Sequence, residues 1–197
     1  MGTELGPRII AMPERRRADG EGRAEPAGGA NSNPPPAPGV KRSRMAQRRR
    51  RARILALETL YETDLAGHQP GEVLQRRSAG SQPEAEVAEY AQELLAGVLR
   101  HRRELDDIIR RRATAFPVEQ MPALDRNILR LGLYETLHKR DTVPLKVAIN
   151  EAIELAKLYA GESSARLVNG VIGREVGSIL GESEIPSAPK NQDSEER

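Results

Sequence analysis

The stretch PLKVAINEAIELAK, residues 144–157, decides the fold class expected for this chain. Its apolar residues, Ile149 and Leu155 among them, recur at the spacing of one side of a helix and do not keep the two-residue alternation of a strand. Pro144 is favoured in the first turn of a helix, and Gly161 follows as a helix-ending residue. We therefore predict a helix that begins at Pro144 and ends before Gly161.

The same helical spacing of apolar residues continues through residues 45–180. We expect the first helix to begin in an arginine run near residue 48 and to end at Gly67, followed by a polar stretch that holds Pro70 and Pro83. Further helices are expected after Pro83, Pro122 and Pro144, and after Ser163 or Ser164 as an N-cap. Five to seven helices with short connections predict an all-α, compact helical bundle.

Both ends of the chain differ from this pattern. Residues 1–44 hold 7 of the 17 glycines and 7 of the 14 prolines, and residues 181–197 hold five acidic residues against two basic ones. Such segments lack the apolar surface that would offset the entropy lost on ordering, so we expect both to be disordered. Met45 lies at the boundary, so the N-terminal extension is either a tail or a mis-set translation start. The folded unit expected from the sequence is residues 45–180.

The composition excludes several classes of protein. The chain has no cysteine, and His68, His101 and His138 are too scattered along it to suggest a ligand set, so we expect no metal site and no cofactor. It has no phosphate-binding loop and no nucleophile elbow, so we do not expect an enzyme. It also has no apolar stretch long enough to cross a membrane and no signal peptide, which predicts a cytoplasmic protein.

Five arginines in six positions form the strongest local feature: Arg48, Arg49, Arg50, Arg51 and Arg53. Like charges at helical spacings of three and four repel each other, and cations near the positive end of a helix dipole are unfavourable. RNA or DNA phosphates would relieve both effects, whereas a solvated, frayed helix start is the plain alternative. Because the net charge of the chain is only +2, the local cluster and not the overall charge indicates nucleic acid.

Two groups of residues are expected to serve the structure. Gly170, Gly173 and Gly177 recur at helical spacing with no preceding strand, so they predict a closely packed helix face and not a dinucleotide-binding loop. The carboxylate of Glu154 is expected to pair with Lys157 along their helix, because residues three apart are neighbours on a helix surface.

Three blocks of sequence at helix positions resemble the NusB family. The first is arginine-rich and runs from Arg49 to Tyr61, and the second is DRNILRL at residues 125–131, followed by Tyr134 and Glu135. The third is the stretch 144–157, followed by Ser163 and by VNGV at residues 168–171. Order, spacing and residue identity agree together, and the resemblance covers essentially all of residues 45–180.

The resemblance implies a bundle of about seven helices that binds the boxA element of nascent single-stranded RNA, usually together with NusE, a small-subunit ribosomal protein. It also implies assembly with RNA polymerase and read-through of terminators in ribosomal RNA operons. The chain would then be a transcription antitermination factor. Whether the free protein is a monomer or a homodimer stays open at this point.

The resemblance also implies roles for individual residues. RNA phosphates would be contacted by Arg48, Arg49, Arg50, Arg51 and Arg53, and the RNA surface would be extended by Lys157, Ser163 and Arg166. NusE would contact Tyr61, Glu119 and Asp125, since acidic groups suit a basic ribosomal protein. Many members of the family carry Phe where this chain has Leu167, so any base-stacking contact of that Phe is absent here.

Three other interpretations compete with this one. The same bundle occurs as the N-terminal domain of an RNA cytosine methyltransferase, but that enzyme needs a catalytic cysteine and a nucleotide-binding α/β domain, and this sequence has neither. A helix-turn-helix repressor would need an outward-facing helix of base-reading polar residues, and the candidate helices present acids instead. A helical scaffold without nucleic acid remains as the third interpretation if the arginine run is only solvated.

Overall fold

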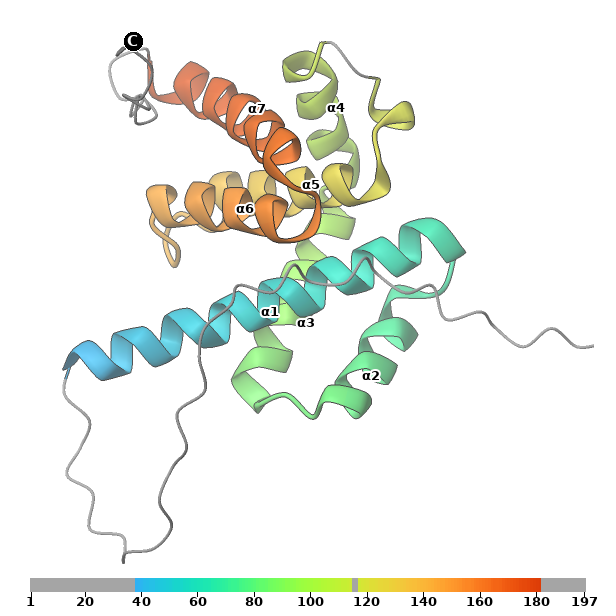
Figure 1. Cartoon of the computed structure of the whole chain (residues 1–197), viewed down its shortest axis with the longest axis vertical. Helices are drawn as coiled ribbons and strands as arrows, with labels where there is room; N and C mark the ends of the chain where they lie inside the picture. The colour runs from blue at the N-terminus through green and yellow to red at the C-terminus, as the bar shows by residue number, and fades with distance from the viewer. Residues whose placement is uncertain (1–37, 115–116, 182–197) are drawn as a thin grey trace, which may run out of the picture.

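Seven α-helices and one short 3-10 helix make up the part of the chain that the computed structural model describes, residues 38–114 and 117–181 (Figure 1). In chain order they are α1 (Pro38–Ala66), α2 (Pro70–Ser81), α3 (Ala85–Arg100), α4 (Arg102–Arg112), η1 (Val118–Gln120), α5 (Ala123–His138), α6 (Leu145–Tyr159) and α7 (Glu162–Leu180). These ranges contain no strand, so the predicted all-α bundle of about seven helices is confirmed. No helix among them is both long and apolar enough to span a membrane. Residues 1–37 and 182–197 lie outside the described ranges, and their disorder stays a prediction.

Two boundaries differ from the prediction. Helix α1 begins at Pro38, before the predicted boundary at residue 45, so part of the expected tail belongs to a 29-residue helix. The polar stretch after Gly67 is helix α2, which has Pro70 in the favoured first turn. Val73 is the one buried residue of α2, and a single buried position explains why apolar spacing does not predict this helix.

Ion pairs hold α2 against α1. Arg77 Nη1 lies 3.1 Å from Glu58 Oε2, Arg77 Nη2 lies 2.9 Å from Glu62 Oε2, and Arg76 also pairs with Glu62. Burial alone would raise the pKa of Glu62, but the hydrogen bond with His68 and the guanidinium of Arg77 lower that pKa below its ordinary value. Glu62 is therefore ionised at neutral pH and attracts both arginines of α2.

Helix α5 is the centre of the bundle. It packs against α1, α3, α4, α6 and α7, and Figure 1 shows α1 crossing the molecule between α2 on one side and α5, α6 and α7 on the other. Its buried apolar residues face more than one side, as in a helix enclosed by neighbours; they include Leu124, Ile128, Leu129, Leu131 and Leu133. Each such side chain contributes about 1.5–3 kcal/mol to folding. This core positions both ends of α5, where the surfaces described below are found.

At two positions a glycine leaves room for side chains of a neighbouring helix. A Cβ added to Gly97 in α3 would lie 2.0 Å from Tyr134 Cζ, and one added to Gly132 in α5 would lie 2.7 Å from neighbouring side chains. Both positions therefore require glycine. Gly170 and Gly173 in α7 have no atom within 4 Å of such a Cβ, so the predicted closely packed face is wrong for these two residues. The reason is that α7 packs through its larger apolar side chains instead.

Candidate nucleic-acid interface

The arginine segment, defined here as residues 48–51, lies on the N-terminal half of α1, which extends beyond the neighbouring helices (Figure 1). Its four side chains are exposed or half-buried. Because α1 begins at Pro38, the segment starts ten residues into the helix, past the first turn where the helix dipole acts. The expected crowding of cations at the positive end of the dipole is therefore wrong. Repulsion between neighbouring guanidinium groups is the effect that remains.

Two arginines of the segment are paired with the start of α3. Arg48 Nε donates to Glu84 Oε2 at 2.6 Å, Arg51 Nη2 donates to Glu84 Oε1 at 3.0 Å, and Arg48 also pairs with Glu86. The hydrogen bonds from Arg51 and Arg48 hold the pKa of Glu84 below its ordinary value. All four side chains are well exposed, so water and salt screen these pairs. The charge of the segment is thus only partly balanced within the free protein.

The other two arginines of the segment differ from each other. Arg49 Nη1 donates to the carbonyl of Thr142 at 2.7 Å, and its guanidinium lies 5.4 Å from the centre of the Tyr90 ring, within cation–π range. Arg50 has no hydrogen bond, ion pair or ring partner within the described residues. Arg50 is therefore available to an external anion without the loss of an internal contact.

Arg53 is separated from the arginine segment by its burial. Its side chain is 2% exposed, its Nε donates to Glu135 Oε2 at 2.8 Å, and its Nη1 lies 3.5 Å from Glu151 Oε2. Burial alone would lower the pKa of Arg53, but the hydrogen bond and the charge of Glu135 raise that pKa above its ordinary value. The expectation that Arg53 lies along RNA phosphates is therefore wrong, because its guanidinium is enclosed between α1, α5 and α6.

Tyr90 completes this buried cluster. Its hydroxyl donates to Glu135 Oε1 at 2.6 Å, so both oxygens of the Glu135 carboxylate accept a hydrogen bond. Burial and the charge of Glu135 raise the pKa of Tyr90, which keeps the hydroxyl protonated and able to donate. Because Arg49 lies over the Tyr90 ring, the cluster also holds one arginine of the segment in place.

Lys157, Ser163 and Arg166 lie near the turn between α6 and α7. All three side chains are exposed, and Lys157 Nζ is 3.2 Å from Glu154 Oε1, which confirms the predicted pairing along α6. Gly161, whose φ is 94°, is the N-cap of α7, so the expected serine cap is wrong. Ser163 is already inside the helix, and its hydroxyl is on the surface of the first turn.

Side-chain contacts show that α1 and the segment that contains α6 run in the same direction. The contacts join Arg49 to the Thr142 carbonyl, Arg53 to Glu151, and Glu58 to the Tyr159 hydroxyl. In these pairs the residue numbers increase together along both segments. At about 1.5 Å per helical residue, Glu58 lies about 10 Å beyond the arginine segment along α1. The arginine segment and the turn between α6 and α7 are therefore separated by about 10 Å along the axis of α1.

The residues expected to contact NusE lie around the start of α5. Arg126 joins three elements here: Arg126 Nη2 donates to Asp64 Oδ2 at 2.6 Å, and Arg126 Nη1 donates to the Val118 carbonyl at 3.1 Å. Burial alone would raise the pKa of Asp64, but the hydrogen bond from Arg126 and the charge of Arg130 lower it below its ordinary value. The C-terminal end of α1, the short helix η1 and the start of α5 are thus held as one unit.

Tyr61 and Glu119 are both accessible on this unit. Tyr61 lies one turn before Asp64 on α1, is half-buried and packs against the hydrophobic core. Glu119 is exposed in η1 and accepts a hydrogen bond of 2.9 Å from Arg110 Nη2, which lowers the pKa of Glu119. The structure therefore brings these two residues to the same end of the molecule.

Asp125 differs from the expectation of an exposed acidic contact. Its side chain is 8% exposed, it is hydrogen-bonded to Ser164 in the first turn of α7, and its Oδ1 has no hydrogen-bond partner within the described residues. Burial raises the pKa of Asp125, and the hydrogen bond with Ser164 offsets part of that rise. The expectation that Asp125 presents its charge to a partner is wrong for the free chain, because α7 covers the carboxylate.

A model of the NusB family matches residues 50–175, which is more than half of the chain. The chain belongs to the NusB family. The transcription antitermination protein NusB of Dehalococcoides mccartyi is 48% identical over 128 residues, which cover 65% of this chain and 89% of the relative. That of Chloroflexus aggregans is 43% identical over 144 residues, which cover 73% of this chain and 96% of the relative. As a member of the NusB family, the chain is a transcription antitermination factor and not an enzyme.

Solved structures of NusB proteins share this fold. The chain is similar to a protein in the structure of a plectonemic RNA supercoil, with a TM-score of 0.63 and 29% identity over 70% of this chain and 99% of the other. It is also similar to a protein in the structure of antitermination factors NusB and NusE in complex with dsRNA. There the TM-score is 0.60, with 29% identity over 67% of this chain and 98% of the other. For T. maritima NusB the TM-score is 0.59, with 28% identity over 70% of this chain and 93% of the other.

The buried role of Arg53 in this NusB-family bundle has a signal in the sequence. Arg53 precedes Leu57 by four residues and Leu60 by seven, so all three lie on one helix face, and both leucines are buried. An arginine on an apolar face needs a buried acid as its partner, but local spacing does not identify Glu135 or Tyr90 as the groups that supply it. The salt bridges of Glu84 likewise depend on the packing of α3 against α1.

Proposed function

We propose that this chain binds boxA-type single-stranded RNA of nascent ribosomal RNA transcripts together with NusE, and that the complex joins RNA polymerase to promote processive transcription of ribosomal RNA operons. The proposal extends the family membership to particular partners. It is supported by the similarity to a protein in a solved complex of NusB and NusE with dsRNA. It is also supported by the arginine segment on the N-terminal half of α1.

The arginine segment is the observation that carries the proposal. Its four side chains are exposed or half-buried, and Arg50 has no partner within the described residues. Arg48 and Arg51 are paired only with exposed carboxylates of α3, and such surface ion pairs contribute little to stability. RNA phosphates can therefore replace Glu84 as their partner at small cost, and each phosphate neutralised releases counterions.

The turn between α6 and α7 extends the proposed RNA surface. Lys157 and Arg166 supply further cations about 10 Å from the arginine segment along α1, and Ser163 supplies a hydroxyl that can donate to a phosphate oxygen. Arg53 is not part of this surface, because its charge is satisfied by Glu135. The proposed RNA contacts are thus the arginine segment together with Lys157, Ser163 and Arg166.

Tyr61 and Glu119 form the proposed contact with NusE. Glu119 is paired with Arg110 in the free chain, but both side chains are exposed, so a basic partner can compete for the carboxylate. Tyr61 supplies an aromatic side chain whose ring packs on the core while part of it stays accessible. Aromatic residues of this kind are common anchors of protein interfaces.

A binding titration tests the proposal. Fluorescently labelled boxA-type single-stranded RNA and a scrambled control of the same length are titrated with the full chain, with and without NusE. We expect the boxA-type RNA to bind more tightly than the control and NusE to increase that difference. Equal and weak binding of both RNAs in the presence of NusE would favour the helical scaffold and contradict the proposal.

A further inference from the structure

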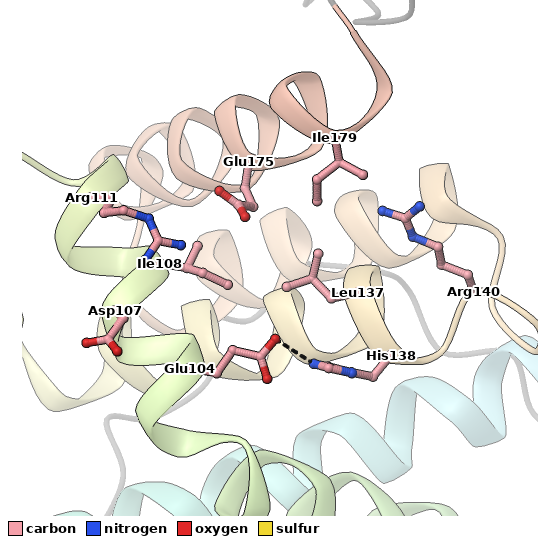
Figure 2. Close-up of a pocket in the computed structure, with 9 residues that line it drawn as sticks. All are labelled: Glu104, Asp107, Ile108, Arg111, Leu137, His138, Arg140, Glu175 and Ile179. Atoms are coloured by element: carbon pink, nitrogen blue, oxygen red, sulfur yellow. Dashed lines mark ion pairs between the residues drawn. The ribbon is translucent and has the colours of Figure 1, made fainter.

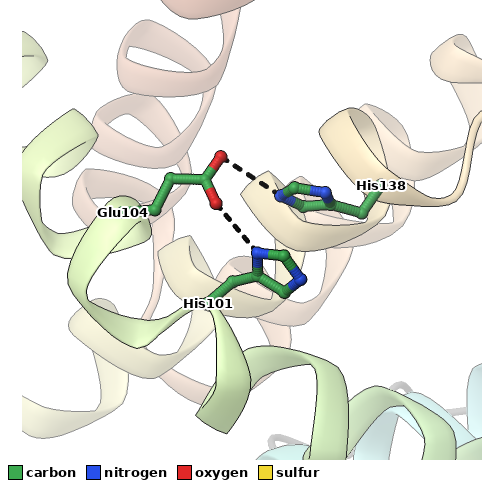
Figure 3. Close-up of side chains that lie close together, drawn as sticks. All are labelled: His101, Glu104 and His138. Carbon is green, nitrogen blue, oxygen red and sulfur yellow. Dashed lines mark hydrogen bonds and ion pairs between the residues drawn. The ribbon is translucent and has the colours of Figure 1, made fainter.

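Two histidines and a carboxylate come together where α3, α4 and α5 meet. His101 Nδ1 lies 2.8 Å from Glu104 Oε2, and His138 Nε2 lies 3.3 Å from Glu104 Oε1, so one carboxylate contacts both imidazoles (Figure 3). The centres of the two imidazole rings are 4.0 Å apart. We call these three residues the His–Glu cluster. The expectation that the histidines are too scattered for a ligand set is wrong for this pair, because packing of α5 on α4 joins residues far apart in sequence.

The backbone holds one side of the cluster in place. His101 lies at the junction of α3 and α4, where its N–H donates to the Gly97 carbonyl and its own carbonyl accepts from the Leu105 N–H, each at 3.0 Å. Glu104 follows in the first turn of α4, three residues later, and so lies on the same face of the helix. The positions of these two groups are thus set by local structure.

The Tyr134 ring holds the two imidazoles. Its centre lies 5.8 Å from that of His101 and 5.5 Å from that of His138, and the three rings are in mutual contact. Gly97 leaves the space that the Tyr134 ring occupies, since a Cβ there would overlap the ring. The cluster is therefore ordered by packing and does not rely on a ligand to assemble it.

We propose that the His–Glu cluster is a binding site for a divalent transition metal ion, with Zn²⁺ as the best-suited ion. Two imidazole nitrogens and a carboxylate oxygen are a ligand set that zinc accepts, and such ligands lie about 2.0–2.2 Å from the ion in a tetrahedron. That geometry separates the ligand atoms by about 3.3 Å. One ligand atom from each of the three residues already lies within 4.8 Å of the others, so small side-chain rotations are enough to enclose an ion.

The cluster is accessible and leaves one coordination position open. The side chains of His101, Glu104 and His138 are 30%, 47% and 27% exposed, so an ion can reach them from solvent. Glu104 and His138 also line a groove of about 680 Å³ between α4, α5 and α7, whose walls carry Arg111 and Arg140 (Figure 2). The fourth coordination position on that side is open to water, because the groove carries the carboxylates of Asp107 and Glu175 as well as the two arginines and so has no excess of positive charge.

Metal binding at this place joins elements that are distant in sequence. Glu104 belongs to α4 and His138 to the last turn of α5, so an ion bound by both fixes the junction of α3 and α4 on the end of α5. Binding to the folded chain alone stabilises it by mass action. An increase of the unfolding temperature with added metal is therefore an expected property of the site.

Calorimetric titration of the full chain with zinc chloride tests the site. The protein carries no histidine tag, and the buffer contains no chelator. We expect one saturable site per chain, an increase of the unfolding temperature with zinc, and, with Co²⁺ as a substitute, the intense visible absorption of a tetrahedral complex. A titration without saturable binding would overturn the proposal.

Single substitutions connect the binding to the cluster. His101→Gln, Glu104→Gln and His138→Gln are each expected to weaken zinc binding by more than about tenfold, since even changes outside the ligand shell reach that size. His68→Gln is the matched control, because His68 is the third histidine of the chain and contacts Glu62 elsewhere. It is expected to bind zinc as the unmodified chain does. Glu104→Gln is the variant least expected to disturb folding, because the side chain is about half exposed.

Two results would contradict the assignment. One is unchanged zinc affinity in all three cluster variants, which would mean that the cluster is only a hydrogen-bonded contact between α4 and α5. The other is an equal loss of affinity in His68→Gln, which would mean that zinc binds nonspecifically to histidines of the chain. Unfolding temperatures measured with a chelator present show whether each variant is folded before its affinity is compared.

Discussion

Arg50 and Arg53 lie three residues apart on α1, yet one is accessible to solvent and the other is 2% exposed. The first has no partner within the described residues, and the second is enclosed with Glu135, Glu151 and Tyr90. The same type of side chain is therefore on the surface at one position and in the core one turn later. Because residues three apart are neighbours on a helix surface, the difference comes from position along α1: α5 and α6 cover Arg53, and Arg50 lies before the covered part. The predictions below test the contrast between accessible and covered positions on arginines, glycines and acids.

The largest effect is expected from Arg53→Met. This change leaves the buried Glu135 carboxylate without its guanidinium, and loss of one partner of a buried ion pair costs about 3–5 kcal/mol of the free energy of unfolding. Urea unfolding followed by circular dichroism measures it. The double variant Arg53→Met and Glu135→Gln should recover part of the loss, since position 135 then carries no buried charge and Tyr90 keeps an acceptor. Recovery is only partial, because the Glu151 carboxylate still lacks its guanidinium. A loss under about 1 kcal/mol would mean that Arg53 is not a core residue.

Much of the fold follows from the sequence, and the exceptions have physical causes. The apolar spacing of α5 and α6 predicts both helices, because both bury apolar faces. It does not predict α2, which buries only Val73 and is held by ion pairs of Arg76 and Arg77 with α1. The early start of α1 at Pro38 is missed as well, since that part of the helix has no apolar stripe that would mark it.

A second effect is expected from Gly97→Ala in α3. The added Cβ would overlap the Tyr134 ring, and overpacking of this kind costs about 1–3 kcal/mol. Gly170→Ala in α7 is the matched control: it has open space and should instead gain roughly 0.5–1 kcal/mol from higher helix propensity. Chemical denaturation of both variants measures the difference. Equal effects of the two substitutions would contradict the contrast between inward and outward positions.

A smaller effect, dependent on pH, is expected from Asp125→Asn. An acid whose pKa is raised by folding binds its proton more tightly in the folded state, so stability falls as pH rises from the ordinary carboxyl pKa through the raised value. The Asn side chain carries no charge and can still accept from Ser164. We expect the variant to be more stable than the unmodified chain at pH 7, with a gap that closes in acid, below the ordinary pKa of aspartate.

Denaturation curves at several pH values between acid and neutral check this prediction. Glu119→Gln is the matched control, because Glu119 is exposed and its neutralisation should change stability little. A gap for Asp125→Asn that is constant with pH, or a lower stability at pH 7, would mean that burial does not disfavour the ionised form. The same two variants, titrated with NusE, separate the accessible acid from the covered one: weaker binding is expected only for Glu119→Gln.

The candidate site could be predicted from the sequence in part. The arginine segment, Lys157 and Ser163 are at the surface as expected, because charge density and helix position are local properties. Asp125 is covered by α7, and Arg53 is covered by α5 and α6. Both depend on tertiary packing, which local sequence does not reveal. The His–Glu cluster joins residues 37 positions apart through the same packing, so spacing along the chain does not reveal it.

The most direct test of the central claim is the salt dependence of RNA binding by Arg49→Ala, Arg50→Ala and Arg51→Ala combined. If these arginines contact phosphates, the slope of log affinity against log salt should shrink by about 0.7 per lost contact, or roughly two units in all. The unfolding temperature should fall only slightly, because Arg49 loses its contacts with Thr142 and Tyr90 while the charges of Arg50 and Arg51 contribute little to folding. A control with three exposed arginines replaced elsewhere (Arg100, Arg103 and Arg111) should keep the original slope. An unaltered slope in the first variant would contradict the account, because the arginine segment would then be only a solvated helix face.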